Sequence, residues 1–263
     1  MRVVIQENLQ AISRWAANHI ANAINSYNLE LRSKDRPFVL GLPTGSTPLL
    51  VYKNLVAMHK AGQISFRNVV TFNMDEYVGL PQNHPQSYWH YMHENLFDHI
   101  DILPQNINIP NGLAPNLDLE CQAYESKIAS LGGIDLFLGG IGVDGHLAFN
   151  EPFTSLVSRT GLRTLTPDTR LANSRFFGGD PTQVPTQAIS VGIGTIFDAR
   201  QILILASGPS KARALAHTIQ GPISHQWTSS ILQMHPNAII LCDEPACDDL
   251  TVSAYRYFKS LEQ

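Results

Sequence analysis

Short apolar segments alternate with longer amphipathic segments along the chain. The short segments are rich in β-branched residues and almost continuously hydrophobic, which is typical of strands buried on both faces of a sheet. They lie at residues 38–42, 69–74, 134–138, 188–191, 201–206 and 238–242. Amphipathic helices are predicted at residues 9–26, 48–61, 87–99, 117–131 and 209–220. This alternation predicts an α/β fold with a doubly wound, mostly parallel, Rossmann-like sheet flanked by helices.

Composition narrows the class of protein. The chain has 263 residues, 44% of them hydrophobic, so it can bury a large core. No internal repeat, low-complexity tract or long Pro/Gly/Ser linker divides it. We therefore expect a single α/β domain over residues 1–263. The formal net charge of -4 and the scattered basic residues disfavour nucleic acid as a partner.

The sequence also indicates a cellular location. Its longest apolar runs have only strand length, too short for a bilayer span, so no association with a membrane is expected. The first residues lack the basic flank and sustained apolar stretch of a secretion signal. Three cysteines are an odd number and cannot all pair within the chain. These features favour a cytoplasmic protein with free thiols.

The loop at residues 41–48, Gly-Leu-Pro-Thr-Gly-Ser-Thr-Pro, follows a predicted strand and opens a predicted helix. Thr47 suits the N-cap of that helix, and Pro48 suits its first position. Gly45 allows close approach of a ligand, while the hydroxyls of Ser46 and Thr47 offer donors at the positive end of the helix dipole. Because no Gly-Lys-[Ser/Thr] follows, a simple phosphoryl group is favoured over a nucleoside triphosphate. From these residues alone, a capped turn without a ligand is an equally good interpretation.

Two adjacent carboxylates, Asp75 and Glu76, follow the predicted strand 69–74. A carboxylate at the carboxyl end of a strand can act as a general base if its surroundings tune its proton affinity. We take Asp75 as the candidate base, with Glu76 pointing elsewhere. Taken in isolation, two solvated loop residues would be the more common finding.

The most informative loop follows the predicted strand 134–138. It contains a G-x-G-x-x-G pattern, but Pro152 comes seven residues after Gly145, so the long helix of a dinucleotide site cannot form. The glycines instead predict a tight loop that presents Asp144, His146 and Glu151 together. A carboxylate can orient and charge-stabilise an imidazole, which then moves a proton near neutral pH. An ordinary packed histidine is the alternative.

Two cationic residues can complete a phosphate site. Lys211 lies near the start of the predicted helix 209–220, and Arg175 lies in the sequence Asn-Ser-Arg-Phe-Phe. No metal is expected, because His90 and His93 share a helix face without a third ligand of matching geometry.

Several motifs in this order closely resemble glucosamine-6-phosphate deaminases. They are the loop at 41–48, Thr-Phe-Asn-Met-Asp-Glu-Tyr-Val-Gly-Leu at 71–80, Gly-Val-Asp-Gly-His-Leu-Ala-Phe-Asn-Glu-Pro at 142–152, and Ser-Arg-Thr at 158–160. The likeness continues through 168–177 and 235–239, so it covers nearly the whole chain. The order and joint presence of the motifs are more specific than any one of them.

The resemblance implies a role for each acidic and imidazole side chain. Asp75 matches the base that moves a proton between C2 and C1 of the opened sugar. His146 matches the residue that promotes ring opening, assisted by Asp144 and Glu151. The implied reaction converts glucosamine 6-phosphate and water to fructose 6-phosphate and ammonia, and it requires no cofactor.

The resemblance also implies how the phosphate is held. The backbone and hydroxyls of the loop 44–47 would bind it together with two cationic side chains; the set is Thr44, Gly45, Ser46, Thr47, Arg175 and Lys211. Residues from about 161 to 187 look like the mobile lid of the family. Closure of such a lid excludes water from the intermediate.

Many hexameric members are activated by N-acetylglucosamine 6-phosphate at subunit interfaces. The possible effector residues here are Ser155, Arg163 and Tyr257, but Gly161 stands where the family has a basic side chain. Loss of one phosphate-binding charge predicts weakened or absent activation. The retained C-terminal segment through Tyr257 favours a homohexamer, although monomeric relatives also exist.

Two other functions fit parts of the sequence. A 6-phosphogluconolactonase resembles this family in fold, but lactone hydrolysis needs no base for a carbon-bound proton, so Asp75 would lack a purpose. A non-catalytic sugar-phosphate sensor would carry an added helix-turn-helix segment, for which this chain has no room before its first strand. The sequence therefore favours the deaminase.

Overall fold

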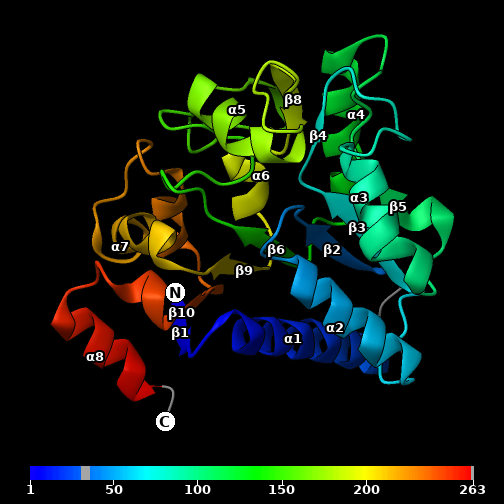
Figure 1. Ribbon diagram of the computed structural model, residues 1–263. Helices are drawn as coiled ribbons and strands as arrows, with labels where there is room; N and C mark the ends of the chain where they lie inside the picture. Colours follow the sequence, from blue (N-terminus) through cyan, green and yellow to red (C-terminus); the bar gives the residue numbers. More distant parts are fainter. Residues whose placement is uncertain (31–35, 262–263) are drawn as a thin grey trace.

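A seven-stranded parallel sheet forms the centre of the molecule (Figure 1). The computed structural model describes residues 1–30 and 36–261. In spatial order the strands are β1 (Arg2–Gln6), β10 (Ala238–Asp243), β9 (Gln201–Ala206), β6 (Leu136–Gly140), β2 (Phe38–Leu42), β3 (Val69–Asn73) and β5 (Ile107–Asn108). Each neighbouring pair runs parallel. The predicted doubly wound parallel sheet is confirmed.

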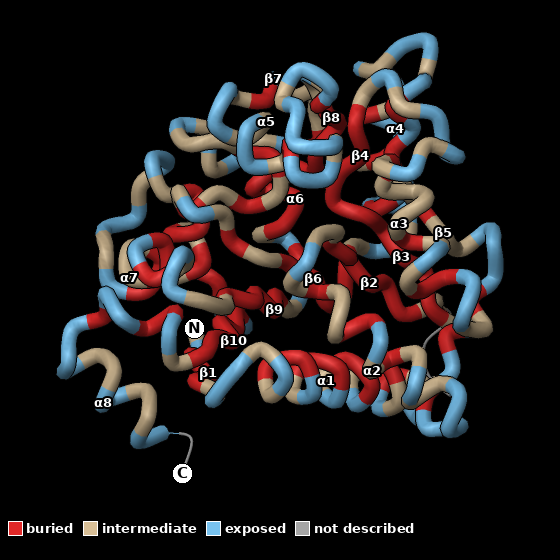
Figure 2. Tube along the Cα trace, in the orientation of Figure 1, coloured by how far each residue is buried: buried red, intermediate tan, exposed pale blue. Residues whose placement is uncertain are grey.

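Helices cover both faces of this sheet, because successive side chains of each strand point to opposite sides. Leu40 packs in one apolar cluster and its neighbour Val39 in another. The first cluster is completed by α1 (Leu9–Glu30), α2 (Leu49–Lys60) and α3 (Tyr88–Asn95), and the second by α4 (Leu117–Ser130), α6 (Ile193–Phe197) and α7 (Ala212–Gln220). Figure 1 shows α1 and α2 below the sheet and α6 above it. Figure 2 shows the buried core following the strands between these layers.

A second, three-stranded sheet lies beyond one face of the first and corrects one prediction. It consists of β4 (Asp75–Tyr77), β8 (Gln187–Ser190) and β7 (Gly161–Thr164), all paired antiparallel. The segment 188–191 was expected in the parallel sheet, and that placement is wrong. A short apolar run indicates that a strand is buried but not which sheet it joins, and β8 is buried as the central strand of this small sheet.

The remaining elements are short or terminal. The segment between β7 and β8 contains α5 (Pro167–Asn173) and the single turn η4 (Ser174–Phe176), and α8 (Val252–Leu261) lies against β1 near the C-terminus. The other short helices are η2 (Phe97–His99), η3 (Pro104–Asn106), η5 (Pro209–Lys211), η6 (Thr228–Met234) and η7 (Glu244–Cys247). The sequence analysis missed β1, β4, β5, β7, α5, α6 and α8, most of which have fewer than six residues or little apolar periodicity.

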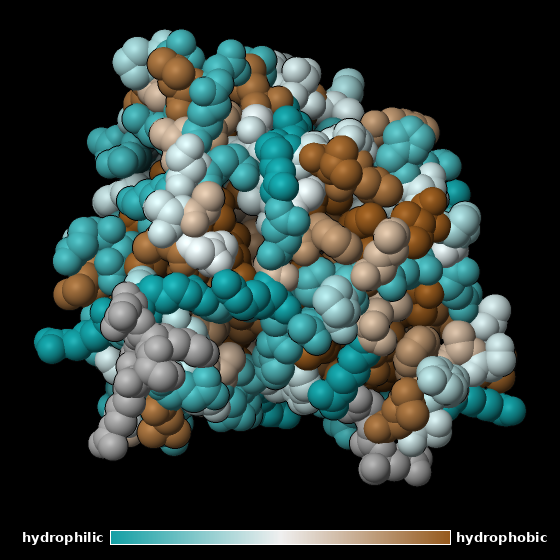
Figure 3. Space-filling view, turned by 180° about the vertical axis from the view of Figure 1, so that it is seen from behind, coloured by the Kyte–Doolittle hydropathy of each residue, from teal (hydrophilic) through white to brown (hydrophobic). Residues whose placement is uncertain are grey.

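The surface is mixed in character. Seen from behind, hydrophobic groups lie in separate patches among hydrophilic ones (Figure 3). Large apolar side chains that are exposed include Phe153, Val157 and Val252. Among residues 1–30 and 36–261, none of the helices combines the length and apolar character needed to cross a bilayer.

Candidate active site

Four neighbouring strands deliver the predicted site loops to one edge of the sheet. Strands β9, β6, β2 and β3 are adjacent and parallel, so their carboxyl ends lie side by side. From β2 the chain moves outward to β3 and β5, and from β6 it moves the opposite way to β9 and β10. The junction of β2 and β6 is therefore a topological switch point, where open α/β sheets bind ligands.

The loop after β2 is shaped by tyrosines from two helices. Tyr91 of α3 donates to the carbonyl of Gly45 over 2.6 Å, and Tyr52 of α2 donates to the carbonyl of Pro43. Gly45 has φ +112°, a conformation that side chains disfavour. These contacts hold the carbonyls of Pro43 and Gly45 toward the helices, while Ser46 remains exposed.

The predicted cap of α2 is wrong by one position. Pro48 is the N-cap residue, Leu49 is the first helical residue, and no side chain accepts a capping hydrogen bond. Thr47 lies in the preceding turn. Without a side-chain cap, the first N–H groups of α2 keep their donor capacity for a ligand.

Asp75 is a buried carboxylate at the start of β4. It is only 5% exposed, and its Oδ1 atom has no hydrogen-bond partner among the described residues. Burial raises the pKa of Asp75 well above its ordinary value, and the charge of Glu76 raises it further. Such a group holds a proton more readily than an ordinary aspartate.

The neighbouring Glu76 has a different environment, as predicted. Its carboxylate accepts hydrogen bonds from the backbone N–H groups of Tyr77, Tyr88 and Trp89, at 2.9 to 3.0 Å. Two of these donors belong to the first turn of α3. Glu76 thereby ties β4 to α3 and anchors the backbone next to Asp75.

Asp144, His146 and Glu151 converge in the loop after β6. One ligand-type atom from each lies within 4.8 Å of the others. Nδ1 of His146 is 2.6 Å from Oδ1 of Asp144. Although burial raises the pKa of Asp144, its hydrogen bond and charge interaction with His146 outweigh that effect and lower the pKa. Asp144 therefore stays ionised beside the imidazole.

Glu151 has partners that the sequence analysis missed. Its Oε1 atom accepts hydrogen bonds from the N–H and hydroxyl of Thr166, both at 3.2 Å, and from the hydroxyl of Thr169 at 2.6 Å. Thr166 is the N-cap of α5. The sequence Thr-Pro-Asp-Thr at residues 166–169 is typical of a helix start and could have indicated this cap. These bonds connect the segment 161–187 to the histidine loop.

The histidine loop is also joined to the strand that carries Asp75. Phe149 donates its N–H to the Ser190 hydroxyl over 3.0 Å, and Ser190 is the register partner of Asp75. Asn150 donates to the Val191 carbonyl at 2.8 Å, and Val191 in turn donates to the carbonyl of the residue before Asp75. The loop and Asp75 are thus held to the same strand, β8.

Residues of η6 support the same loop from its other side. Gly145 has φ +79°, and a Cβ atom there would lie 2.6 Å from the ring of Trp227. Ser229 donates its N–H to the Gly145 carbonyl at 3.0 Å, and the Thr228 hydroxyl accepts from Leu147 at 3.3 Å. Nothing in the spacing of the sequence predicted this support, because η6 is about eighty residues away.

The two predicted cationic residues, Lys211 and Arg175, lie on separate elements. Lys211 is the N-cap residue of α7 and is partly buried. Burial lowers its pKa; the carboxylate of Asp144 opposes this, and the charge of Arg175 adds to it. Lys211 is therefore within electrostatic range of both. Arg175 lies on η4, exposed, with its guanidinium 4.7 Å from the Phe176 ring.

The possible effector residues lie on three different segments of the chain. Arg163 donates to the Asn150 side chain at 3.0 Å and to the Arg159 carbonyl at 2.9 Å, so its guanidinium has internal partners. Ser155 lies in the loop before β7. Tyr257 is 60% exposed on α8, at the opposite end of the molecule from β7 (Figures 1 and 2).

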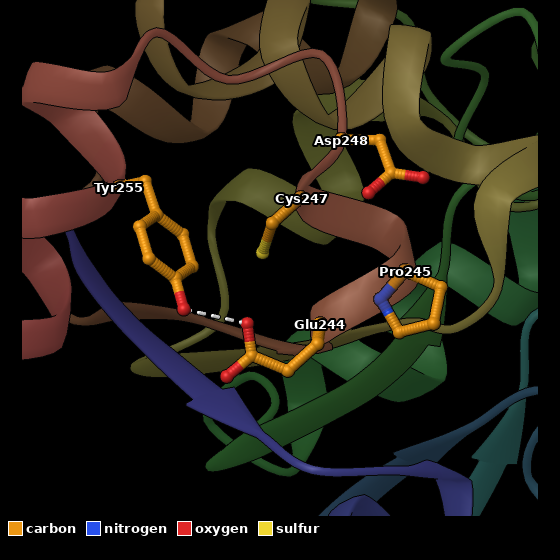
Figure 4. Close-up of a pocket in the computed structure, with 5 residues that line it drawn as sticks. All are labelled: Glu244, Pro245, Cys247, Asp248 and Tyr255. Atoms are coloured by element: carbon orange, nitrogen blue, oxygen red, sulfur yellow. Dashed lines mark hydrogen bonds between the residues drawn. The ribbon is translucent and has the colours of Figure 1, made fainter.

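Two surface cavities are lined by residues other than the predicted site residues. One, of about 430 Å³, is lined by Glu244, Pro245, Cys247, Asp248 and Tyr255 (Figure 4). The other, of about 370 Å³, lies beside α4 and includes Glu125 and Arg159. We assign the candidate active site to the sheet edge, where Asp75 has a buried oxygen without a partner among the described residues and a histidine lies beside two carboxylates. Such groups indicate chemistry more directly than cavity volume does.

Comparisons with known proteins identify the family of this chain. Residues 7–242 match the model of a family described as glucosamine-6-phosphate isomerases/6-phosphogluconolactonase. A glucosamine-6-phosphate deaminase of Yersinia enterocolitica is 56% identical over 262 residues, covering 100% of this chain and 97% of its own length.

Solved structures show the same relationship. A monomeric glucosamine-6-phosphate deaminase superposes with a TM-score of 0.88 at 40% identity, covering 95% of this chain and 100% of its own. The 6-phosphogluconolactonase of Trypanosoma cruzi has a TM-score of 0.73 at 20% identity, covering 95% and 97% of the two chains, and shares the fold. The chain therefore belongs to the family of glucosamine-6-phosphate isomerases and 6-phosphogluconolactonases.

Proposed function

We propose that this chain is a glucosamine-6-phosphate deaminase, which converts glucosamine 6-phosphate and water to fructose 6-phosphate and ammonia. The observation that carries the proposal is the environment of Asp75. It is a buried carboxylate with a raised pKa and with one oxygen that has no partner among the described residues, at the carboxyl edge of the sheet beside the switch point. Full-length similarity to a deaminase supports it. Overall the reaction breaks a C–N bond with water, so we class the enzyme as a hydrolase of amino sugar phosphates.

Binding begins at the phosphate. The N–H groups and hydroxyls of the loop 44–47 would receive it at the uncapped start of α2, with Lys211 and Arg175 supplying positive charge. Because Arg175 lies on the segment 161–187, its contact with the phosphate would couple binding to movement of that segment. We propose this segment as the lid, and the bonds from Glu151 to Thr166 and Thr169 as its attachment to the site.

His146 would open the sugar ring. The imidazole transfers a proton to the ring oxygen as the C1 hydroxyl loses its own, which yields the open aldehyde. Asp144, whose Oδ1 lies 2.6 Å from Nδ1, would orient the imidazole for this proton transfer. Glu151 adds a second carboxylate within the same 4.8 Å cluster.

Asp75 would then act on carbon. Its carboxylate removes the proton from C2, which is acidified by the C1 aldehyde and by the ammonium on C2, and the enolamine forms. The protonated acid returns the proton to C1, so the product is an imine at C2. Water adds to that imine and ammonia leaves. No cofactor is needed, because the substrate's own substituents stabilise the developing negative charge.

One assay tests this proposal against its nearest rival. Purified protein is supplied either with glucosamine 6-phosphate, with ammonia measured, or with 6-phosphogluconolactone, with acid release measured. Ammonia release with little lactone hydrolysis is expected. Rapid lactone hydrolysis without ammonia would refute the deaminase assignment, and absence of both activities with retained sugar-phosphate binding would favour a sensor.

We further propose that activation by N-acetylglucosamine 6-phosphate is weak or absent. Gly161 offers no charge, and Arg163 is occupied by Asn150 and a backbone carbonyl. Velocity against substrate should be hyperbolic and unchanged by the acetylated sugar phosphate. Strong activation at micromolar effector would refute this. Light scattering in the same buffer tests the expected homohexamer against a monomer.

A further inference from the structure

Two buried cysteines that take no part in the proposed reaction lie next to one another. Cys242 is the fifth residue of β10, and Cys247 ends the short helix η7. Their Sγ atoms are 3.6 Å apart, and both residues are unpaired in the structure. A disulfide requires the two sulfurs to close to about 2.05 Å. The pair is therefore within one small side-chain movement of a bridge.

One of the two sulfurs is reachable from the surface. Cys247 is only 6% exposed, but it lines the cavity of about 430 Å³ together with Glu244 and Tyr255. In Figure 4 its sulfur points from η7 toward the side where Glu244 and Tyr255 lie. Cys242 is fully buried behind it. A reagent that enters this cavity meets Cys247 first and Cys242 second.

The chemistry of the two thiols matches this order. The hydrogen bond with Cys247, followed by burial and nearby negative charge, raises the pKa of Cys242. Cys242 is thus kept as a thiol until its neighbour has reacted. Since a thiolate is the nucleophile in thiol exchange, Cys247 is the better attacking group and Cys242 the resolving one.

We propose that Cys242 and Cys247 form a dithiol modification site that takes a bridging thiophilic group or closes to a disulfide. With a low-molecular-weight disulfide as oxidant, the Cys247 thiolate attacks one sulfur and releases one thiolate. Cys242 then attacks the Cys247 sulfur and releases the second. Two protein thiols are oxidised, the small disulfide is reduced to two thiols, and the two protein protons pass to them. An organoarsenic(III) oxide instead forms two S–As bonds and releases water, without a redox change.

Bridging would affect the position of Lys211, which is proposed to bind the phosphate, through Asp243. The carboxylate of Asp243 accepts from the Ser207 hydroxyl at 2.5 Å and from the Gly208 N–H at 2.9 Å. Its carbonyl accepts a 3.4 Å contact from the Cys247 thiol, which a bridge would remove. Ser207 and Gly208 directly precede η5, which carries Lys211. This part of the inference rests on the proposed function, because it assigns Lys211 to the substrate phosphate.

Mass spectrometry of the intact full-length protein tests the site. Phenylarsine oxide should add one bridging group, and oxidised glutathione should remove the mass of two hydrogens without leaving a glutathione adduct. Cys242→Ala and Cys247→Ser should abolish both changes, whereas Cys121→Ser is the control, since Cys121 is also buried but lies on α4. Equal bridging in all variants, or none in the wild type, would overturn the proposal.

Two further measurements distinguish a misfolded variant, and a missing link to Lys211, from a failure of the proposed dithiol site. If a variant does not fold, proteolytic fragments of the labelled wild type must show both cysteines in one bridged fragment, and labelling at Cys121 instead would contradict the site. In the activity assay, the bridged protein should show a KM raised by about threefold to tenfold with a smaller change in kcat, and reversal by dithiothreitol. An unchanged KM would remove the link to Lys211. The mass result does not depend on activity, so it survives a failure of the proposed reaction.

Discussion

Asp75 and Glu76 are adjacent acidic residues that differ in the hydrogen bonding of their carboxylates. Glu76 accepts three backbone N–H groups, whereas one oxygen of Asp75 has no partner among the described residues. A buried polar atom without a partner costs stability. Natural proteins keep such destabilising groups mainly at sites where function requires them. This contrast assigns chemistry to Asp75 and structural support to Glu76.

Replacing Asp75 with Asn should remove the base while preserving shape. We expect turnover of glucosamine 6-phosphate to fall by about 10² to 10⁴, the usual contribution of a positioned general base. Ammonia release under saturating substrate measures it. Glu76→Gln is the matched control: it should lower the melting temperature, because it weakens three hydrogen bonds, yet keep more activity than Asp75→Asn. Full turnover in Asp75→Asn would exclude the base assignment.

The raised pKa of Asp75 also predicts how stability depends on pH. For a carboxyl group whose pKa is higher in the folded state, protonation favours folding, so its contribution is most favourable below the unfolded pKa. That contribution is lost as pH rises through the folded value. Asp75→Asn should therefore melt at a higher temperature than wild type at pH 7.5, with the difference shrinking as pH is lowered. A lower melting temperature at pH 7.5 would contradict the burial of a charged Asp75.

The same raised pKa predicts the acid limb of activity. A base must be ionised to accept a proton, so kcat/KM should fall as pH drops through the pKa of Asp75 in the free enzyme. That limb should lie above 3.8, the ordinary value for an aspartate. A pH profile of ammonia release from pH 5 to 9 measures it, with stability checked at each pH. Activity that stays flat to the lowest pH at which the protein is folded would argue against it.

At the scale of elements, the histidine loop depends on support from both sides. Ser190 of β8 and the next residue, Val191, hold its later residues, and Thr228 and Ser229 of η6 hold its earlier ones. The loop itself contains no helix or strand beyond a short bridge. Its geometry is therefore set by elements far away in sequence.

Gly145→Ala tests this support. The new methyl group would meet the Trp227 ring at 2.6 Å and would also occupy a left-handed backbone conformation. We expect a loss of about 2 to 4 kcal/mol in the free energy of unfolding and a large loss of turnover. Gly178→Ala is the control, because Gly178 has φ +66° but no atom within 4 Å of the added Cβ. Equal losses in both variants, measured by denaturant unfolding, would show that backbone strain alone matters.

At the scale of the whole molecule, the carboxyl and amino edges of the parallel sheet differ in function. The carboxyl edge carries the proposed chemistry. At the amino edge, Asp135 accepts hydrogen bonds from Arg36 at 2.5 and 2.9 Å, from Arg200 at 3.2 Å and from the Val39 N–H at 2.9 Å. Asp135 thereby joins the starts of β2, β6 and β9, at the far end of the strands from the site.

Asp135→Ala should therefore affect stability without affecting catalysis. Because it leaves the buried Val39 N–H unpaired, while Arg36 stays partly exposed and can be hydrated, we expect a loss of about 2 to 4 kcal/mol in the free energy of unfolding. Turnover per folded molecule should stay close to wild type. Urea unfolding and ammonia release measure the two quantities. A large fall in kcat of the folded variant would contradict this separation of the two edges.

The local pattern of apolar and polar residues was sufficient to predict many of the elements and loops of this protein. Hydrophobic periodicity predicts the buried strands 38–42, 201–206 and 238–242 and the helix at 117–131. The spacing of apolar residues depends directly on whether one face or both faces of an element are buried. The three site loops also followed from the sequence, because each begins where an apolar strand stops. The alternation of strands and helices implied that these loops share one edge.

Tertiary structure alone decided the rest, because long-range contacts have no signal in local spacing. It placed β8 in a small antiparallel sheet, moved the start of α2 past Thr47, and brought Thr166 and Thr169 to Glu151. It also separated the roles of Asp75 and Glu76, which are two neighbouring acids in the sequence and differ only in what surrounds them. Residue types and their order determined what chemistry is present; packing determined which groups are buried, which are paired, and which remain free to react.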